Sequence, residues 1–213
     1  MEGPMKQNYQ KQLDALLKTL PEEKRPRLLL HACCAPCSSY VLEYLSQRFS
    51  ITLYYYNPNI SPVEEYSRRL EELKRLLGKM PLPPDTALLP APYDPARFAA
   101  AARGLEDERE GGARCRACYA LRLEQTARAA KEGGFDYFCT TLSISPLKNA
   151  EWLNELGEGF GRQYGVPYLP SDFKKREGYK RSIVLSQQYG LYRQDYCGCA
   201  YSKAERERQK AHE

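Results

Sequence analysis

Seven of the eight cysteines in this chain fall into three short groups, and their spacing is the feature best suited to chemistry. The groups are "CCAPC", "CRAC" and "CGC", which hold Cys33, Cys34 and Cys37, then Cys115 and Cys118, then Cys197 and Cys199. Thiolates this close together can bind one metal ion or iron–sulfur cluster from a single turn. Cys139 lies alone in the apolar segment "FDYFCTT" and is expected to be a small buried side chain. The sequence therefore predicts metal binding or redox chemistry at the three groups.

The spacing leaves the kind of centre open. C-x-x-C pairs occur in zinc sites, in iron–sulfur proteins and in thioredoxin-like redox pairs, and thiolate ligands alone do not distinguish zinc from iron. Four thiolates complete one tetrahedral zinc site or hold one four-iron cluster, so three thiols remain for a second metal or for a dithiol–disulfide pair. Because the groups lie far apart in the sequence, we favour a functional site assembled by the fold over a structural zinc site.

Composition narrows the class of protein. The 213 residues are 42% hydrophobic and 28% charged, with a formal net charge of +5 that permits an anionic partner such as nucleic acid. No apolar run approaches the length needed to cross a bilayer, so we expect no membrane insertion. The start, "MEGPMKQNYQKQ", has no apolar segment typical of a secretory signal. We therefore expect a cytoplasmic location, where thiols stay reduced.

Apolar periodicity predicts alternating strands and helices. Strands are predicted at "RLLLHA", "ITLYYY", "TALLPA" and "FDYFCTT", with "VPYLP" as a further short strand. Helices are predicted within 1–25, at 36–49, 61–78, 115–132 and 149–164, and near 178–190 and 199–211, the fifth of them interrupted by glycines. In the helix at 61–78, Ser61 is expected to form the N-terminal cap, with Glu64 completing a capping box. The stretch 80–95 is expected to be mostly loop.

This alternation predicts a single α/β domain. The expected sheet is mostly parallel, has about four to five strands and is covered by helices on both faces, with further helices at the C-terminus. We divide the chain into a leading helix (1–25), a core (27–170) and a helical C-terminal part that carries Cys-Gly-Cys (171–213). In such sheets ligands bind beyond the carboxyl ends of the strands. Polar segments follow each predicted strand there, so we expect one crevice to collect them: "HACCAPC", "NPNISP", "APYDP", "TTLSISPLKN" and "SDFKKREGYK".

Several longer phrases surround the cysteines in order, and together they resemble the QueH family of epoxyqueuosine reductases. They cover nearly everything from His31 to Ser202: "HACCAPCS", "YYYNPNISPVEEYSRR", "RCRACYALRLEQTA", "FDYFCTTLSISPLKN", "SDFKKREGYKRS" and "LYRQDYCGCAYS". The resemblance implies a Rossmann-like, nucleotide-hydrolase-like fold. It also implies the last step of queuosine synthesis, in which the epoxide oxygen is removed from epoxyqueuosine at the wobble position of a tRNA. A 4Fe-4S cluster, a second cysteine-based redox or iron site and no cobalamin are expected, with electrons from an external flavodoxin-like or ferredoxin-like donor.

The resemblance also implies roles for the thiols. The favoured cluster ligands are Cys33, Cys34, Cys115 and Cys118, with Cys37 as a ligand of an additional mononuclear iron. Cys197 and Cys199 are then a redox-active disulfide pair or ligands of that second iron. A competing division gives the cluster Cys33, Cys115, Cys118 and one cysteine of the last pair, and leaves the other three thiols to the lone iron. His31 is expected either to donate a hydrogen bond to a metal ligand or to be a histidine at the end of a strand whose hydrogen bonds are already satisfied.

Other residues are candidates for substrate binding and proton transfer. The expected tRNA contacts are Asn57, Asn59, Lys148, Lys174, Lys175 and Arg193, partly because "FKKREGYKR" interleaves cations with aromatic rings. Reduction of the epoxide needs a proton source, for which Asp94, Lys148, Asp172 and Asp195 are candidates. The alternative function from another class is a zinc-stabilised RNA-binding module without redox activity. A PP-loop nucleotide enzyme is disfavoured, because no Gly-rich phosphate cradle is present.

Overall fold

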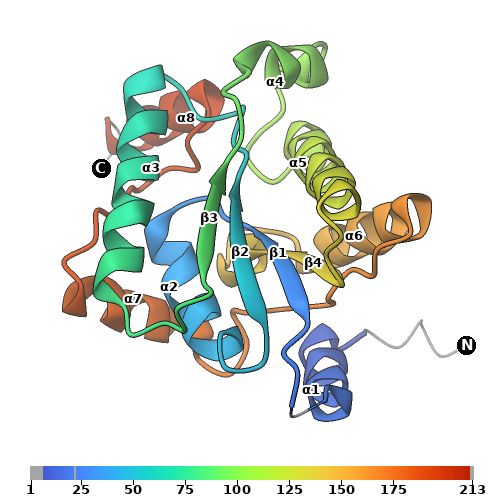
Figure 1. Ribbon diagram of the computed structural model, residues 1–213. Coiled ribbons are helices and arrows are strands. Elements are labelled where there is room, and N and C mark those ends of the chain that lie inside the picture. Colours follow the sequence, from blue (N-terminus) through green and yellow to red (C-terminus); the bar gives the residue numbers. More distant parts are fainter. Residues whose placement is uncertain (1–6, 22, 212–213) are drawn as a thin grey trace, which may run out of the picture.

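The computed structural model describes residues 7–21 and 23–211, built around a sheet whose four strands all run parallel in the order β3-β2-β1-β4. Figure 1 shows this sheet at the centre of the molecule. The strands are β1 (Arg27–His31), β2 (Ser50–Tyr55), β3 (Ala87–Pro90) and β4 (Tyr137–Thr140). The predicted strand "VPYLP" contributes one isolated parallel bridge, from Tyr168 to Phe138 beside β4. The predicted α/β class with a parallel sheet of four to five strands is confirmed.

Helices cover both faces of the sheet. They are α1 (Tyr9–Thr19), α2 (Ala35–Leu45), α3 (Val63–Lys79), α4 (Pro95–Ala102), α5 (Ala113–Glu132), α6 (Ala150–Tyr164), α7 (Gly178–Gln188) and α8 (Ala200–Lys210), with a 3-10 helix η1 (Thr141–Ile144). Successive side chains of a strand point to opposite faces, so Leu28 and Leu30 of β1 pack with α2 and α3, whereas Leu29 packs with α5 and α6. In the described part of the chain, no helix combines the length and apolar character needed to cross a membrane. The cytoplasmic location stays a prediction.

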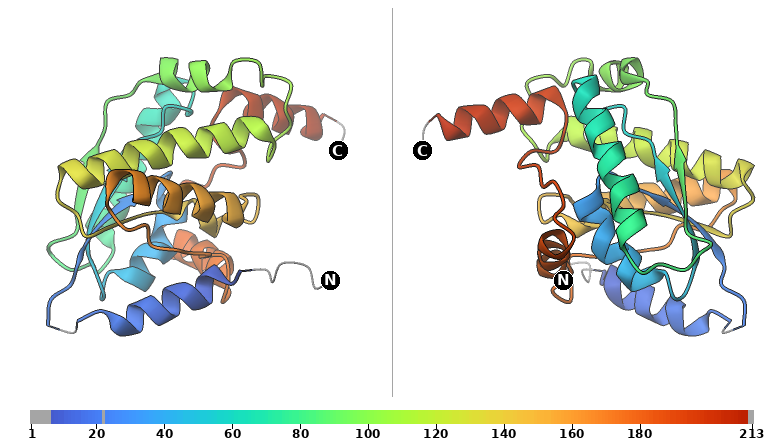
Figure 2. Two further views of the ribbon diagram at one scale, coloured as in Figure 1. Left: turned by 90° about the vertical axis from the view of Figure 1, so that its right-hand side faces the viewer. Right: turned by 60° about the vertical axis from the view of Figure 1, so that its left-hand side comes forward.

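The carboxyl ends of the strands lie at the edge of the sheet nearest α4 and α8. In Figure 1 the arrows of β2 and β3 point toward that edge, and Figure 2 shows α1 at the opposite end of the molecule. Helix α1 is held there by α2, because the Tyr44 hydroxyl donates to Asp14 Oδ1 at 2.8 Å and Leu13 is fully buried. Helix α7 packs against α2 from the other side. The edge at the carboxyl ends of the strands is therefore the one available to the connections that carry the cysteines.

The predicted capping of the third helix is wrong. Helix α3 begins at Val63 with Pro62 at the N-cap position and no capping hydrogen bond from a side chain. The backbone N–H of Ser61 instead donates to the carbonyl oxygen of Gly198 at 2.9 Å. A tertiary contact with the Cys-Gly-Cys segment thus replaces the local capping preference. Helix α4 was not predicted, although Asp94 at its N-cap and Pro95 in its first turn are ordinary helix-starting residues.

Helix α6 is continuous, and two of its glycines allow the chain to pack closely. A Cβ atom at Gly161 would lie 2.9 Å from the Val166 carbonyl oxygen and 3.2 Å from the Tyr168 backbone nitrogen. A Cβ at Gly157 would lie 2.5 Å from the ring of Tyr168. By contrast, a Cβ at Gly159 would have no neighbour within 4 Å. The glycines at 157 and 161 are therefore required by close packing rather than by an interruption of the helix.

This difference predicts opposite effects of two alanine substitutions in one helix. Gly161→Ala is expected to lower the free energy of unfolding by about 1–3 kcal/mol, since the new methyl group meets backbone atoms that cannot easily move. Gly159→Ala is expected to raise it by about 0.5–1 kcal/mol, because alanine has the higher helix propensity. Denaturant unfolding of both variants beside the parent protein checks the sign. Equal effects at the two positions would contradict the packing argument.

Candidate active site

The first cysteine group lies in the connection between β1 and α2. The Sγ atoms of Cys33, Cys34 and Cys37 all lie within 4.8 Å of one another, which is close enough to hold one metal ion. Hydrogen bonds from the Cys33 and Cys37 thiols, and then the positive charge of Arg69, hold the pKa of Cys34 well below its usual value. Cys34 is also the N-cap residue of α2, where the helix dipole favours negative charge. Of the three thiols, Cys34 is therefore the one that carries negative charge most readily.

The second and third groups meet above the first turns of α5. Cys115, Cys118, Cys197 and Cys199 line one small, mainly apolar pocket together with Phe98 and Tyr119. Burial raises the pKa of Cys115 and of Cys118, and it raises the pKa of Cys199 to about 12. These three thiols are therefore protonated at neutral pH, and binding a metal there would release their protons.

A cavity of about 220 Å³ lies between these two sets of thiols. Cys33, Cys34 and Cys37 line one part of its wall, and Cys197 belongs both to this wall and to the small pocket. The polar lining is completed by a set of charged and hydrogen-bonding side chains: Arg69, Glu110, Arg122, Ser145, Lys148, Tyr179, Ser182, Arg193, Gln194, Asp195 and Tyr196. The first group and Cys197 thus line one cavity, and Cys197 joins it to the small pocket that the second and third groups share.

Arg69 of α3 fixes the Cys-Gly-Cys segment over this cavity. Its Nε donates to Glu65 Oε1 at 2.7 Å, and its Nη1 donates to the carbonyl oxygen of Cys197 at 3.0 Å. Gly198 has a φ of +123°, and a Cβ there would lie 2.9 Å from Nη1 of Arg69 and 3.1 Å from Ile60. Only glycine fits this conformation and this space, which explains the middle residue of the motif.

Arg122 of α5 lies one helical turn after Cys118 and is almost completely buried. Its Nη2 donates to Asn57 Oδ1 at 2.6 Å, and its Nε lies 3.2 Å from Nε2 of His31. Asn57 in turn donates to the carbonyl oxygen of Ala32 at 2.9 Å, which fixes the start of the first cysteine loop. Burial, followed by the Arg122 charge, lowers the pKa of His31 to about 3, so this imidazole is neutral at pH 7.

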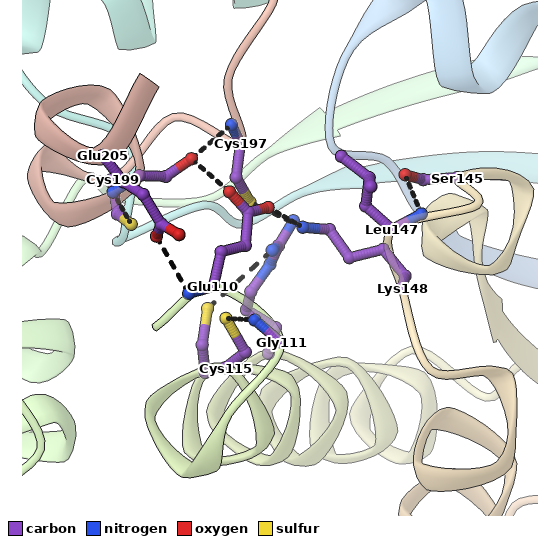
Figure 3. Close-up of polar contacts among 12 residues, drawn as sticks. Glu110, Gly111, Cys115, Ser145, Leu147, Lys148, Cys197, Cys199 and Glu205 are labelled. Carbon is purple, nitrogen blue, oxygen red and sulfur yellow. Dashed lines mark hydrogen bonds and ion pairs between the residues drawn. The ribbon is translucent and has the colours of Figure 1, made fainter. Parts of the chain in front are cut away.

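A buried polar network joins the second wall of the cavity. Lys148 Nζ lies 3.0 Å from Cys197 Sγ and 3.1 Å from Glu110 Oε1, and Figure 3 shows the Lys148 and Glu110 side chains pointing toward one another beside Cys197. Ser202 Oγ donates to the other Glu110 oxygen at 2.7 Å. Burial acts to raise the pKa of Glu110, but the Lys148 ammonium and the Ser202 hydroxyl outweigh it and leave the pKa below its usual value. Glu110 is therefore ionised at neutral pH.

Comparisons with known proteins agree with this arrangement. Residues 28–205 match the model of the family described as epoxyqueuosine reductase QueH. The chain belongs to this family. It is 44% identical over 205 residues to the epoxyqueuosine reductase QueH of Streptococcus pyogenes serotype M1, a match that covers 95% of this chain and 80% of that protein. It is 33% identical over 187 residues to the protein of the same name from Thermotoga maritima, covering 86% and 94%.

The QueH match includes all seven clustered cysteines, and the structure distributes the predicted tRNA contacts among three places. Lys148 and Arg193 line the main cavity, and Lys148 also lines an adjoining cavity of about 420 Å³ that includes Lys174 and Lys175. Asn57 and Asn59 are 1% and 2% exposed and lie outside the lining of the main cavity. Their roles in substrate binding stay predictions.

The basic stretch of this QueH protein is largely neutralised by its own carboxylates. Four ion pairs account for most of its cations: Lys174 with Asp172, Arg176 with Asp14, Lys180 with Glu177 and Arg181 with Glu43. Of the candidate proton donors, Asp195 lines the cavity, but the hydrogen bond from Lys210 lowers its pKa and keeps it ionised. Asp172 is paired, and Asp94 is the N-cap residue of α4. Lys148 therefore has the most direct access to the thiols.

Three charged residues at the site were missed by the sequence analysis: Arg69, Glu110 and Arg122. Arg122 could have been found, because it follows Cys115 by seven residues and Cys118 by four, which places all three on one face of a helix. Glu110 lies in the loop before α5 and had no such signal. Cys139, in contrast, is buried in β4 as predicted, with its Sγ 3.3 Å from the Leu169 carbonyl oxygen.

The Lys148 network predicts a large stability effect from one substitution. Lys148→Met is expected to lower the free energy of unfolding by about 3 kcal/mol, because it leaves the Glu110 carboxylate without its cation in a mostly buried place. The double variant Lys148→Met/Glu110→Gln should recover most of this loss. Lys180→Met is the control, since its ion pair with Glu177 is exposed and is expected to contribute about 1 kcal/mol or less. Similar losses in both single variants would contradict the role given to this network.

Proposed function

We propose that this protein reduces epoxyqueuosine to queuosine in tRNA, with a 4Fe-4S cluster and a second iron bound by its seven clustered cysteines. The observation that carries this proposal is that the three cysteine groups line a cavity and a small pocket that share Cys197, in a member of the epoxyqueuosine reductase QueH family. The electrons would come from an external donor of the flavodoxin or ferredoxin kind. The reaction requires no cobalamin in this proposal, because the thiol-bound iron supplies the redox chemistry.

The donor set supports iron rather than a single structural zinc ion. Seven thiols exceed the four ligands that one tetrahedral zinc ion takes, and they form two neighbouring sets. We propose that Cys115, Cys118, Cys197 and Cys199 bind the cluster, and that Cys33, Cys34 and Cys37 bind the second iron. The shared pocket of the first set and the 4.8 Å spacing of the second support this division. It differs from the quartet favoured by sequence, which takes Cys33 and Cys34 with Cys115 and Cys118.

The chemistry sets what the surrounding residues must do. Removing the epoxide oxygen as water consumes two electrons and two protons and leaves an alkene. The bound cluster and iron would supply the electrons and a Lewis acid for the oxygen. Lys148 lies on the cavity wall between Cys197 and Glu110, where its ammonium can donate a proton or a hydrogen bond to an oxygen in the cavity. Glu110 and Ser202 hold this ammonium in place.

The cavity also supports a nucleoside substrate. A volume of about 220 Å³ is on the scale of a single base taken out of its stack, as enzymes that modify bases require. Tyr179, Arg193 and Tyr196 on its wall offer aromatic and guanidinium surfaces on which a base can stack. Lys175 lines the adjoining cavity and, unlike Lys174, forms no ion pair within the described residues, so it is suited to a neighbouring phosphate. We propose that these two cavities together receive the modified nucleotide and its backbone.

An activity assay tests this function directly. Anaerobically purified protein should be brown and, with a chemical reductant, should convert epoxyqueuosine to queuosine in tRNA, as detected by digestion and mass spectrometry of the nucleosides. Cys115→Ala and Cys118→Ala are expected to lose colour and activity together. Cys139→Ala is the matched control and should keep both, since this thiol lies in the core away from the cavity. Colourless protein that contains only zinc would instead support an RNA-binding module without redox activity.

Iron and acid-labile sulfide counts test the division of the thiols. Cys197→Ala and Cys199→Ala are expected to reduce both iron and sulfide, because they would remove cluster ligands. Alanine at Cys33, Cys34 or Cys37 should remove iron but leave the sulfide, because a mononuclear site contains none. Loss of sulfide from Cys33→Ala and Cys34→Ala, with full retention in Cys199→Ala, would return the cluster to the quartet favoured by sequence.

A further inference from the structure

Arg122 is a buried cation that has no negative partner in the part of the chain that the structure describes. It is 1% exposed, and its guanidinium nitrogens reach an imidazole, an amide oxygen and the Cys118 thiol, at 3.2, 2.6 and 3.9 Å. Imidazole and amide groups carry no negative charge, and a thiol is neutral until it loses its proton. Within 7–21 and 23–211, no carboxylate forms an ion pair with Arg122, whereas the comparably buried Arg69 is paired with Glu65 at 2.7 Å. The charge of Arg122 is therefore uncompensated among these residues.

Such an arrangement is costly unless an anion completes it. Transferring an unpaired guanidinium from water into a protein interior is strongly unfavourable, and natural proteins pair buried charges or place them against bound ions. Among the thiolates, those of Cys118, Cys33 and Cys197 would have the strongest electrostatic effect on Arg122, and each comes from a different cysteine group. Arg122 also reaches the wall of the main cavity. The missing anion therefore belongs at the meeting point of the thiols.

Thiol-bound iron fits this requirement. Cysteine binds metal as the thiolate, and four thiolates around an iron–sulfur core give an assembly with net negative charge that increases by one on reduction. A fixed positive charge beside it stabilises the reduced form more than the oxidised form. We propose that Arg122 is the resident counter-cation of the iron–sulfur centre and raises its reduction potential. This inference rests on the proposed function, because it requires iron at these cysteines.

The test compares Arg122→Gln, which removes the charge but keeps hydrogen-bonding groups, with Arg122→Lys, which keeps the charge. Reduction potentials are measured by titration of the anaerobic proteins, with electron paramagnetic resonance as the readout and iron and sulfide counted in each sample. Arg122→Gln should bind the cluster with a reduction equilibrium at least about tenfold less favourable, equivalent to about 59 mV for one electron. Arg122→Lys should lie closer to the parent protein. If Arg122→Gln takes up no cluster while Arg122→Lys does, the requirement for charge is equally supported.

Two results would overturn the proposal. An Arg122→Gln protein with the parental reduction potential would show that the charge does not act on the centre. If, in addition, KM for the tRNA rises in this variant, Arg122 instead binds an anion of the substrate. Failure of both variants to take up iron would show that the shape of the arginine, not its charge, is required. The outcome is separable from the proposed function, which fails only if the parent protein itself binds no iron–sulfur cluster.

Discussion

The site depends on two hydrogen bonds that bring the end of the chain back onto the sheet. The Ser61 N–H donates to the carbonyl oxygen of Gly198, and Arg69 donates to that of Cys197. Ser61 belongs to the connection that follows β2, and Arg69 belongs to α3. Both residues lie next to the loop that carries Cys34. These contacts place Cys197, which lies some 160 residues from the first group in the sequence, on the wall of the same cavity, and Cys199 in the small pocket beside it. Without them, the parallel sheet would present only the first two groups at its edge.

Positive charge is concentrated around these thiols, and this links metal binding to the energetics of the fold. Arg69, Arg122 and Lys148 all lie on the cavity wall, where Glu65 pairs with Arg69 and Glu110 pairs with Lys148. When thiolates bind iron, the negative charge that they bring is placed against these cations. If iron binds as proposed, the apo protein carries an electrostatic cost that the loaded protein does not, and metal binding would stabilise the native state accordingly. A site of this kind favours the filled form without any rearrangement of the sheet.

The sequence was sufficient for the class of fold, but not for the arrangement of side chains at the candidate site. Apolar runs identified β1, β2 and β4 because most of their residues are buried, whereas β3 is mostly exposed. The rule for parallel sheets placed the polar connections at one edge. The contact between Ser61 and Gly198 was not predictable, because a local capping preference competes there with a tertiary hydrogen bond. The sequence also did not show which thiols lie together, because this depends on how the segment after α7 packs over α5. Glu110 could not be recognised at all, because an acidic residue in a polar loop becomes distinctive only when Lys148 lies against it.

The ion pairs of the basic stretch also change how nucleic-acid binding is understood. Its cations hold elements together, since Arg176 reaches Asp14 of α1 and Arg181 reaches Glu43 of α2. Charges committed in this way attract phosphates less strongly than the composition suggests, because the neighbouring carboxylates repel them. Lys148 and Arg193, in contrast, lie on the wall of the cavity that the thiols share. In the proposed function, recognition of the nucleotide would therefore be concentrated at the main cavity, where Lys148 and Arg193 lie beside the thiols.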